Sequence, residues 1–261
     1  MNTLLNGKTA RGAIGFVVFF ALWEACCRIG VIDPDLLPPA SVTLARAAEL
    51  AVDAEFLGYV GETLVTWAIG LLVAAVVAIP LGALMGSLRP VEKALRPLVE
   101  FLRPIPAVSI IPLAMLLISD VQRMQITIVV YAATWPMLIN TIYGMHDVDK
   151  VAKETLRSFG FSPAAVVWRV SLPSAAPFIA TGVRLSAAIA LIAAISAQLL
   201  GPGSGIGGFL IQAQSGLDSL DTLVAAALWA GLLGVVTNAA LALTERRMFR
   251  WHIAKAKGGR A

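Results

Sequence analysis

The stretch KETLRSFGFSPAAVVWRVSLPSA, residues 153–175, decides the fold, because it places two short, basic, amphipathic segments between two long apolar runs. Gly160 suits the left-handed residue that ends a helix. Ser162 suits an N-cap, and Pro163 suits the first position of the helix that follows. The stretch therefore predicts a helix-turn-helix elbow.

The first segment of the elbow has one apolar face. Its start is predicted at Asp147 or Asp149, whose carboxylate can cap the helix and meet the positive end of the helix dipole. The residues that fall on the apolar face are Val151, Thr155, Leu156 and Phe159. Such a face indicates either a helix that rests on the inner leaflet or a helix that docks into a groove of another protein. The residues alone do not separate these two interpretations.

The composition around the elbow is that of an integral membrane protein. The chain has 261 residues, of which 58% are hydrophobic and 14% charged, and its mean hydropathy is +0.82. Soluble domains carry about 25% charged residues. The net charge of +4 is explained by membrane orientation rather than by nucleic acid binding.

The apolar runs predict a single transmembrane domain over residues 1–261, an all-α membrane protein of six spans. Backbone groups in lipid must be paired within a segment, so helices are expected. The predicted spans cover residues 12–30, 63–87, 98–118, 125–144, 178–200 and 222–243. The elbow then lies in a connection over residues 145–177, and a short outer helix is expected to start at Ser41.

The basic residues predict the orientation. With the N-terminus in the cytoplasm, 17 of the 20 Lys and Arg residues fall on the inner side, and only Arg28, Arg46 and Arg123 fall outside. The excess of basic residues on one side predicts that both termini and the elbow are cytoplasmic, with membrane lipid around the spans. It also places Arg250, Lys255, Lys257 and Arg260 inside and Asp218 outside.

Glycines and prolines mark irregular positions in the spans. Gly82 and Gly86 form a small-xxx-small pair that lets a neighbouring helix approach closely. Pro104, Pro106 and Pro112 remove helix donors from the third span. Broken backbone at membrane depth needs protein or a water-filled cavity beside it. This span is therefore a candidate pathway wall, and a purely structural kink remains equally open.

Motifs for catalysis and cofactors are not found. The run GSGIGG at 203–208 matches a dinucleotide loop, but it joins two membrane helices and lacks the surrounding strand-turn-helix unit. No phosphate loop for ATP is present. His146 and His252 are far apart, and Cys26-Cys27 lacks metal-ligand spacing. The chain is therefore expected not to be an enzyme and to bind no cofactor or metal.

Polar groups inside spans are candidate functional residues, because they are costly in lipid. Glu24 is one such residue, and Arg28 one turn later can pair with it near the outer surface; apart from Glu24, the spans are expected to lack a buried ionisable relay. The candidate pathway residues are Ser109, Thr134, Asn140 and Gln198. They can line a path or form hydrogen bonds between helices, and both interpretations stay open.

Several motifs together resemble one family. Glu154, Gly160 six residues on, and then Leu172-Pro173 resemble the EAA loop of permease subunits of bacterial ATP-binding-cassette importers. The motifs LRPLVEFLRPIPAVSIIPLAMLL, TWPMLINTIYGMHDVD, SLPSAAPFIATGVRLS and LLGPGSGIGGFLI resemble the branch for nitrate, bicarbonate, taurine and other sulfonates. The resemblance covers nearly the whole chain.

The resemblance implies a type I importer permease in the bacterial inner membrane. Its elbow would be a coupling helix in a groove of one of two cytoplasmic ATPase subunits, which bind the ATP. A second permease subunit, the same or different, and an extracytoplasmic binding protein would complete the assembly. By position, Glu154 and Gly160 would fix the elbow, Val151, Leu156 and Phe159 would supply apolar contacts, and Leu172-Pro173 would end the motif.

The sequence departs from the family at a few positions. Thr155 and Leu156 stand where the family usually has two alanines, Gln198 stands where a glutamate is frequent, and Ile118-Ser119-Asp120 replaces a turn that commonly contains glycine. The predicted function is a permease for a small solute, a small oxyanion or other organic anion being favoured. The rival is a stand-alone secondary carrier or channel, which would ordinarily need a buried ionisable relay.

Overall fold

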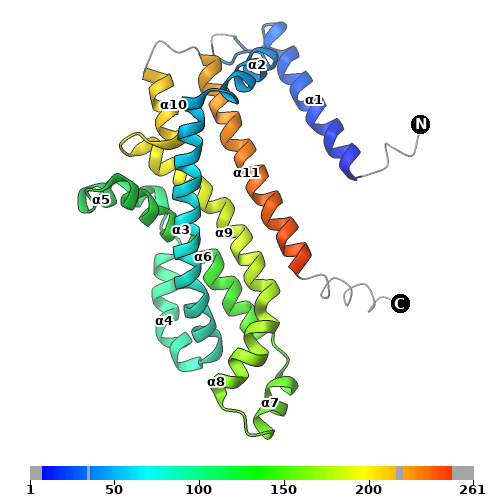
Figure 1. The fold of residues 1–261 in the computed structure, drawn as a ribbon, viewed down its shortest axis with the longest axis vertical. Helices are drawn as coiled ribbons and strands as arrows, with labels where there is room; N and C mark the ends of the chain where they lie inside the picture. The colour runs from blue at the N-terminus through cyan, green and yellow to red at the C-terminus, as the bar shows by residue number, and fades with distance from the viewer. Residues whose placement is uncertain (1–7, 34–35, 216–219, 249–261) are drawn as a thin grey trace.

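The computed structural model describes residues 8–33, 36–215 and 220–248, and these residues form helices and connections without a strand. The helices are α1 (Lys8–Arg28), α2 (Ala40–Leu50), α3 (Ala54–Ser87), α4 (Arg89–Leu102), α5 (Ala107–Leu117), α6 (Val121–His146), α7 (Lys150–Ser158), α8 (Pro163–Val166), the π-helical turn η1 (Val167–Ser171), α9 (Leu172–Leu200), α10 (Gly205–Ser215) and α11 (Leu220–Met248). The molecule is long, with α2 and α10 at one end and α7 at the other (Figure 1).

Five helical segments are long and apolar enough to cross a membrane, and a sixth is obtained if α4 and α5 count as one broken span. The predicted all-helical membrane fold is therefore confirmed. The helices extend beyond the predicted spans, because a helix continues past its most apolar window: α3 starts at Ala54 rather than at residue 63, and α11 ends at Met248 rather than at residue 243.

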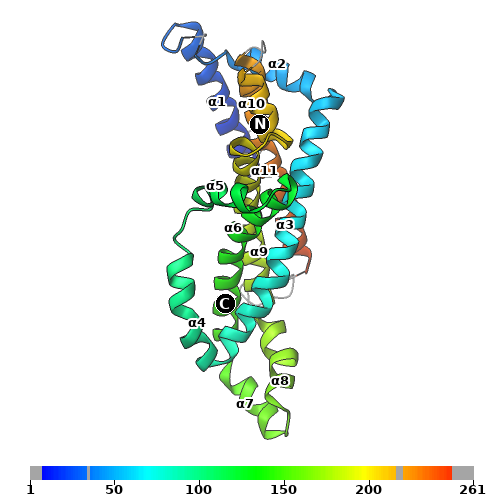
Figure 2. The same ribbon diagram turned by 90° about the vertical axis from the view of Figure 1, so that its left-hand side faces the viewer.

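The core of the bundle is made of α3, α6 and α9, which lie side by side along the molecule (Figures 1 and 2). Glycines on α3 allow the backbone to approach α6. A Cβ atom built at Gly82 would lie 2.7 Å from Cβ of Thr141, and one built at Gly86 would lie 2.5 Å from Cβ of Met145. The predicted close approach at Gly82 and Gly86 is confirmed.

The third predicted span is broken. Helices α4 and α5 meet at an angle of 91°, and α4 stands apart from α6 and α9 in Figure 2. The break coincides with Pro104 and Pro106, whereas Pro112 lies inside α5 without ending it. Pro106 has no N–H to donate to the carbonyl of Leu102, and the hydroxyl of Tyr131 on α6 donates to that carbonyl instead, at 2.6 Å.

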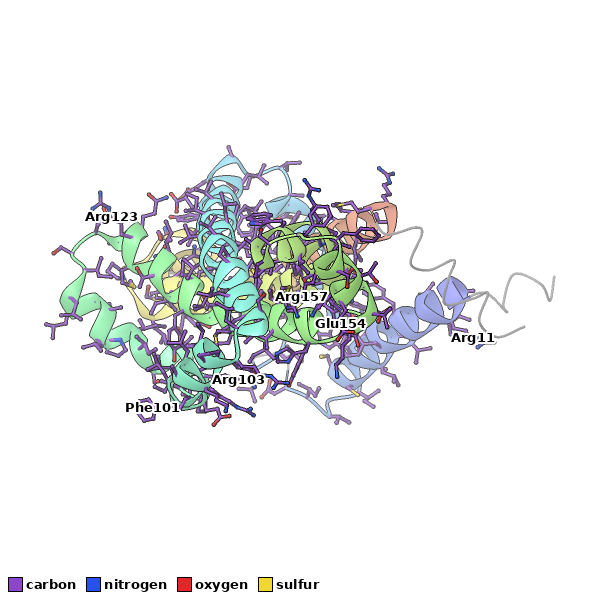
Figure 3. All side chains as sticks on the ribbon, turned by 90° about the horizontal axis from the view of Figure 1, so that it is seen from below. Arg11, Phe101, Arg103, Arg123, Glu154 and Arg157 are labelled. Atoms are coloured by element: carbon purple, nitrogen blue, oxygen red, sulfur yellow. The ribbon has the colours of Figure 1, made fainter. Side chains whose placement is uncertain are left out.

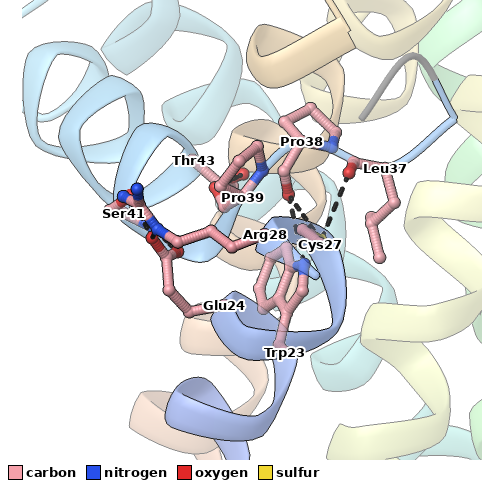
Figure 4. Close-up of polar contacts among 9 residues, drawn as sticks. All are labelled: Trp23, Glu24, Cys27, Arg28, Leu37, Pro38, Pro39, Ser41 and Thr43. Atoms are coloured by element: carbon pink, nitrogen blue, oxygen red, sulfur yellow. Dashed lines mark hydrogen bonds and ion pairs between the residues drawn. The ribbon is translucent and has the colours of Figure 1, made fainter. Parts of the chain in front are cut away.

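At the end of the molecule opposite α7, α1 is joined to α2 by a polar cluster (Figure 4). The Glu24 carboxylate accepts hydrogen bonds from the Arg28 guanidinium at 2.6 Å and from the backbone N–H and hydroxyl of Ser41 at 2.9 Å each. The indole N–H of Trp23 donates to the carbonyl of Pro38. The predicted Glu24–Arg28 pair is confirmed, but Ser41 does not cap α2, which begins at Ala40.

The ends of the chain point in one direction. In Figure 1 α1 and α11 both extend from the α2 end in the direction of α7, and both stop well short of it. That both termini share the side of the elbow stays a prediction. Asp218 and the basic residues of the tail, Arg250, Lys255, Lys257 and Arg260, lie outside the described residues.

Candidate functional site

The elbow is built from capping groups that act locally. The carboxylate of Asp149 accepts the N–H of Val151 at 2.9 Å and caps α7. Gly160 follows the helix with φ +80°. The N–H of Gly160 donates to Arg157, and that of Phe161 to Leu156, which is the paired pattern of a Schellman motif.

The second half of the elbow starts at the predicted place. The Ser162 hydroxyl accepts the N–H of Ala165, and Pro163 is the first helical residue. The helix then runs as one segment from Pro163 to Leu200, through the π-helical turn η1. Leu172 and Pro173 therefore lie inside this long helix, and the connection ends at Ser162 rather than at residue 177.

The apolar face of the elbow is not covered by the other residues that the structure describes. Val151, Phe159 and Trp168 are 67%, 78% and 71% exposed, and Leu156 is half-buried. The main neighbours of α7 are α8 and η1. Figure 3 views this end of the molecule and shows Glu154 and Arg157 on the elbow in front of the bundle. The elbow thus presents large apolar side chains at the tip of the molecule.

Two side chains attach the elbow to the bundle. The ammonium of Lys153 donates to the carbonyl of Met145 near the end of α6, at 3.0 Å. Desolvation lowers the pKa of Lys153, and the neighbouring charge of Arg157 lowers it further. The guanidinium of Arg169 lies 5.0 Å from the ring centre of Phe161, a cation–π contact across the turn. The elbow is therefore held to both α6 and the start of the long helix.

A groove lies between α4 and α6. It consists of two adjacent cavities of about 540 Å³ and 420 Å³ that share Arg103 and Ile139 in their walls. The lower cavity, toward the elbow, is lined by Glu92, Arg96, Glu100, Tyr143 and His146 among others. The upper cavity, beside the α4–α5 break, is lined by Tyr131, Trp135, Asn140, Leu185 and Ile189 among others. The broken third span thus forms one wall of a groove, and its part in a pathway stays a prediction.

The predicted pathway residues do not all reach this groove. Asn140 lines the upper cavity, with its amide donating to the carbonyl of Pro136. Ser109 lies exposed on α5, and Thr134 lies on α6 with its hydroxyl bonded to the carbonyl of Val130. Gln198 is fully buried near the opposite end. Their roles in transport remain predictions.

Gln198 belongs to a cluster that fixes the start of α10. Its side-chain oxygen accepts the Thr63 hydroxyl at 2.9 Å, and Thr63 in turn accepts the N–H of Ile206. The Glu62 carboxylate accepts the N–H of Gly205 at 2.7 Å. The free N–H groups at a helix start need such acceptors. Neither Glu62 nor Thr63 was identified from the sequence, which placed Glu62 at the end of an outer loop and Thr63 at the first position of the predicted second span. The available signal was their position where the apolar run begins.

A second ionic contact was also missed. The Arg184 guanidinium on α9 lies 3.2 Å from the Glu245 carboxylate on α11. Glu62 in α3 is exposed, and Glu245 lies near the inner end of α11; both residues were assigned to connections and belong to helices that extend past the predicted spans.

The fold and the groove define the class of the protein as a multi-pass helical membrane transport subunit. The family described as "binding-protein-dependent transport system inner membrane component" matches residues 78–250 of the 261. The chain belongs to this family. It is a permease of an ATP-binding-cassette importer, in the branch whose curated members include sulfonate, taurine and nitrate permeases.

Individual relatives cover most of the chain. An aliphatic sulfonate transport permease of Bacillus subtilis is 27% identical over 92% of this chain and 87% of its own length. The taurine transport system permease of Escherichia coli is 26% identical over 90% of this chain and 87% of its own length. A chain from the inward-facing structure of the MetNI methionine ABC transporter has a TM-score of 0.63 and 18% identity, covering 75% of this chain and 94% of that chain, which shows the fold.

Proposed function

We propose that this permease couples ATP hydrolysis by a partner to the passage of a small anion, with the elbow as the coupling device. The observation that supports the proposal is the uncovered apolar face of α7, continuous through a short turn with the helix from Pro163 to Leu200. Exposed apolar patches of this kind mark interaction sites. A helical face of this size suits a groove in another protein.

The partners follow from this proposal. Two cytoplasmic ATPase subunits would hold the ATP, so the permease itself would be neither an enzyme nor a cofactor-binding chain. A second permease subunit, the same or different, would complete the path, and an extracytoplasmic binding protein would deliver the solute. The assembly would lie in the inner membrane of a bacterium, with both termini and the elbow in the cytoplasm.

Force would pass through the long helix. The 38 residues from Pro163 to Leu200 form a lever of about 57 Å at 1.5 Å per residue. This lever packs along α6, which forms a wall of the groove. Movement of the elbow would therefore move α9 against α6 and change access to the groove. The shift requires ATP to favour one of the two states, since a ligand moves an equilibrium only by its differential affinity.

Each candidate residue takes a role in this scheme. Val151, Leu156 and Phe159 would contact the ATPase. Glu154 and Gly160 would fix the elbow, and the pair Leu172-Pro173 would lie at the lower end of the lever. The proposed pathway residues are Ser109, Thr134, Asn140 and Gln198.

The solute is proposed from the relatives. The sulfonate and taurine permeases are named for small solutes that carry a sulfonate group, and a nitrate import permease is also similar. A solute of this kind, carried by the binding protein, is our proposal for this chain. The rival is a secondary carrier that moves a solute without ATP.

Reconstitution separates the two. The permease is purified from native membranes with its associated ATPase and binding protein, placed in liposomes, and supplied with labelled taurine, ethanesulfonate and nitrate. We expect uptake of at least one of these only with internal ATP. Uptake at the same rate without ATP, driven by an ion gradient, would establish the secondary carrier.

A further inference from the structure

We propose that the upper cavity of the groove between α4 and α6 binds the transported solute as an anion, with Arg103 as the cation that holds it. This inference rests on the proposed function. It goes beyond it by giving the solute a binding site within the permease itself and by naming the residue that selects its charge.

The charges around the groove single out Arg103. In the lower cavity, Glu92 lies 3.4 Å from the imidazole of His146, and Arg96 lies 2.8 Å from Glu100. Arg103 lines both cavities. Its side chain makes no hydrogen bond or ion pair within the part of the chain that the structure describes. It is thus a cation without a counter-charge at the boundary between the two cavities.

The upper cavity favours an anion over a cation. Its walls contain no carboxylate among the described residues, whereas they contain Arg103, the amide of Asn140 and the indole of Trp135. Trp135 packs against Tyr131 in this wall, with the ring centres 5.5 Å apart, so its indole contributes aromatic surface to the cavity.

Most of the remaining wall is apolar, with Tyr131 as the exception. Ala107, Leu185 and Ile189 line the same cavity, and Arg103 stands at its solvent-exposed edge. The planar guanidinium matches an oxyanion with two parallel hydrogen bonds. A volume of about 420 Å³ lies within the range of small-ligand pockets, about 300–1,000 Å³. A nitrate or a short alkylsulfonate fits this chemistry.

The backbone holds Arg103 at the place where the path bends. Arg103 follows α4 directly, and Pro104 and Pro106 keep the chain from continuing as a helix. The hydroxyl of Tyr131 on α6 donates a hydrogen bond to the carbonyl of Leu102, which precedes Arg103, at 2.6 Å. In Figure 3 Phe101 projects outward from α4, and Arg103 lies on the side nearer the bundle. The cation is therefore directed to the groove by the same break that separates α4 from α5.

Ligand protection tests the site without relying on transport. In a full assembly whose permease carries Cys26→Ser and Cys27→Ala, an Ile139→Cys variant places one thiol in the wall of both cavities. We expect ethanesulfonate or nitrate, at ten times its Kd, to slow labelling of this thiol by an uncharged maleimide about tenfold. Adding Arg103→Gln should abolish this protection at the same concentration. Leu116→Cys, 83% exposed on α5, should be labelled at one rate throughout.

Equal labelling of Ile139→Cys with and without both anions would overturn the proposal, as would protection that persists in Arg103→Gln. Transport supplies a second readout. Arg103→Gln should reduce ATP-driven anion uptake roughly ten- to a hundred-fold, Arg103→Lys should restore part of it, and Lys93→Gln on α4 should have no effect. Unchanged uptake in Arg103→Gln overturns the anion site alone. Failure of the unmodified assembly to use ATP overturns the proposed function instead, and the labelling result still decides the site.

Discussion

At each end of the bundle the chain turns at glycine, but the surroundings of the two turns differ. At the outer end, the glycine loop at 201–208 turns the chain into α10, and its last four residues are buried. The N–H groups of Gly205, Ile206 and Gly207 are met by side chains from α3 and α9. At the elbow, Gly160 also turns the chain, but nothing lies within 4 Å of a Cβ atom built there.

The difference shows how far each end is hydrogen-bonded and covered by other parts of the described chain. The outer loop finds acceptors for its N–H groups in Glu62, Thr63 and Gln198, although the amide nitrogen of Gln198 has no hydrogen-bond partner among the described residues. The elbow satisfies its own backbone through Asp149 and the Schellman motif, yet it leaves its apolar side chains uncovered. Changes at the outer end should therefore cost stability, and changes at the elbow should cost coupling.

The largest expected effect is at the outer end. In Gly207→Ala the new Cβ atom would lie 2.5 Å from the backbone nitrogen of Leu199 and 2.6 Å from the carbonyl oxygen of Ile195. Backbone atoms cannot turn aside, so we expect a loss of about 3 kcal/mol or more of stability, measured as thermal unfolding in detergent. Gly231→Ala, with open space around it, is the control. Similar melting of both variants would mean that the outer loop is not packed as described.

A smaller loss is expected for Gln198→Leu. The change removes the acceptor of the Gly207 N–H and one of the two acceptors of the Thr63 hydroxyl, which also bonds the carbonyl of Tyr59, at a fully buried position. A buried donor left unpaired costs about 1–3 kcal/mol. The thermal midpoint should fall, and Gln214→Leu, on the exposed part of α10, should leave it in place. Uptake separates the two roles proposed for Gln198: an altered solute range indicates a pathway residue, and an unchanged range with lower stability indicates packing.

The elbow should respond differently. Gly160→Val forces a β-branched residue to φ +80°, which costs about 1–2 kcal/mol, and we expect insertion and melting to change little while ATP-driven uptake is lost. Leu156→Glu should do the same by placing a charge on the apolar face. The control is Ser158→Ala on α7, whose hydroxyl bonds only within its own helix. Normal uptake and normal stimulation of ATPase activity in both variants would contradict the proposed role of the elbow.

The smallest effect is expected where the elbow meets α6. Lys153→Met keeps the apolar stem but removes the hydrogen bond to the carbonyl of Met145, which is worth about 1 kcal/mol. Hydrogen exchange should become faster in residues 150–158, while the core of α6 stays protected. Lys150→Met, at the exposed start of α7, is the matched control. Faster exchange throughout the bundle would show that the contact supports the whole fold rather than the elbow.

The sequence predicted features whose causes lie close together in the chain. Asp149, Gly160, Ser162 and Pro163 act on residues within one turn, so the elbow could be predicted in detail. The break at Pro104 and Pro106 likewise follows from missing donors. Ion pairs could be predicted only where the two residues lie one helical turn apart, as Glu24 and Arg28 do.

Features that depend on distant residues were not predicted. Thr63 and Gln198 are 135 residues apart in the chain, and Glu62 and Gly205 are 143 apart, so no local pattern connects them. The sequence predicted only one wall of the groove, the broken third span, because the other wall belongs to a different helix, α6. The long helix through Leu172 and Pro173 was not predicted, because a residue followed by proline ordinarily marks a helix boundary. Here the helix continues through Pro173, directly after a π-helical turn.

The most direct test asks what covers Phe159. A photo-crosslinking amino acid is placed at residue 159 in the complete assembly, and the same amino acid at Leu116 on α5 serves as the control. We predict a crosslink from residue 159 to the ATPase subunit that changes in yield when ATP is bound, and none from residue 116. Crosslinks from residue 159 to lipid alone, in an assembly that transports its solute, would contradict the assignment of the elbow as the site where the ATPase grips the permease.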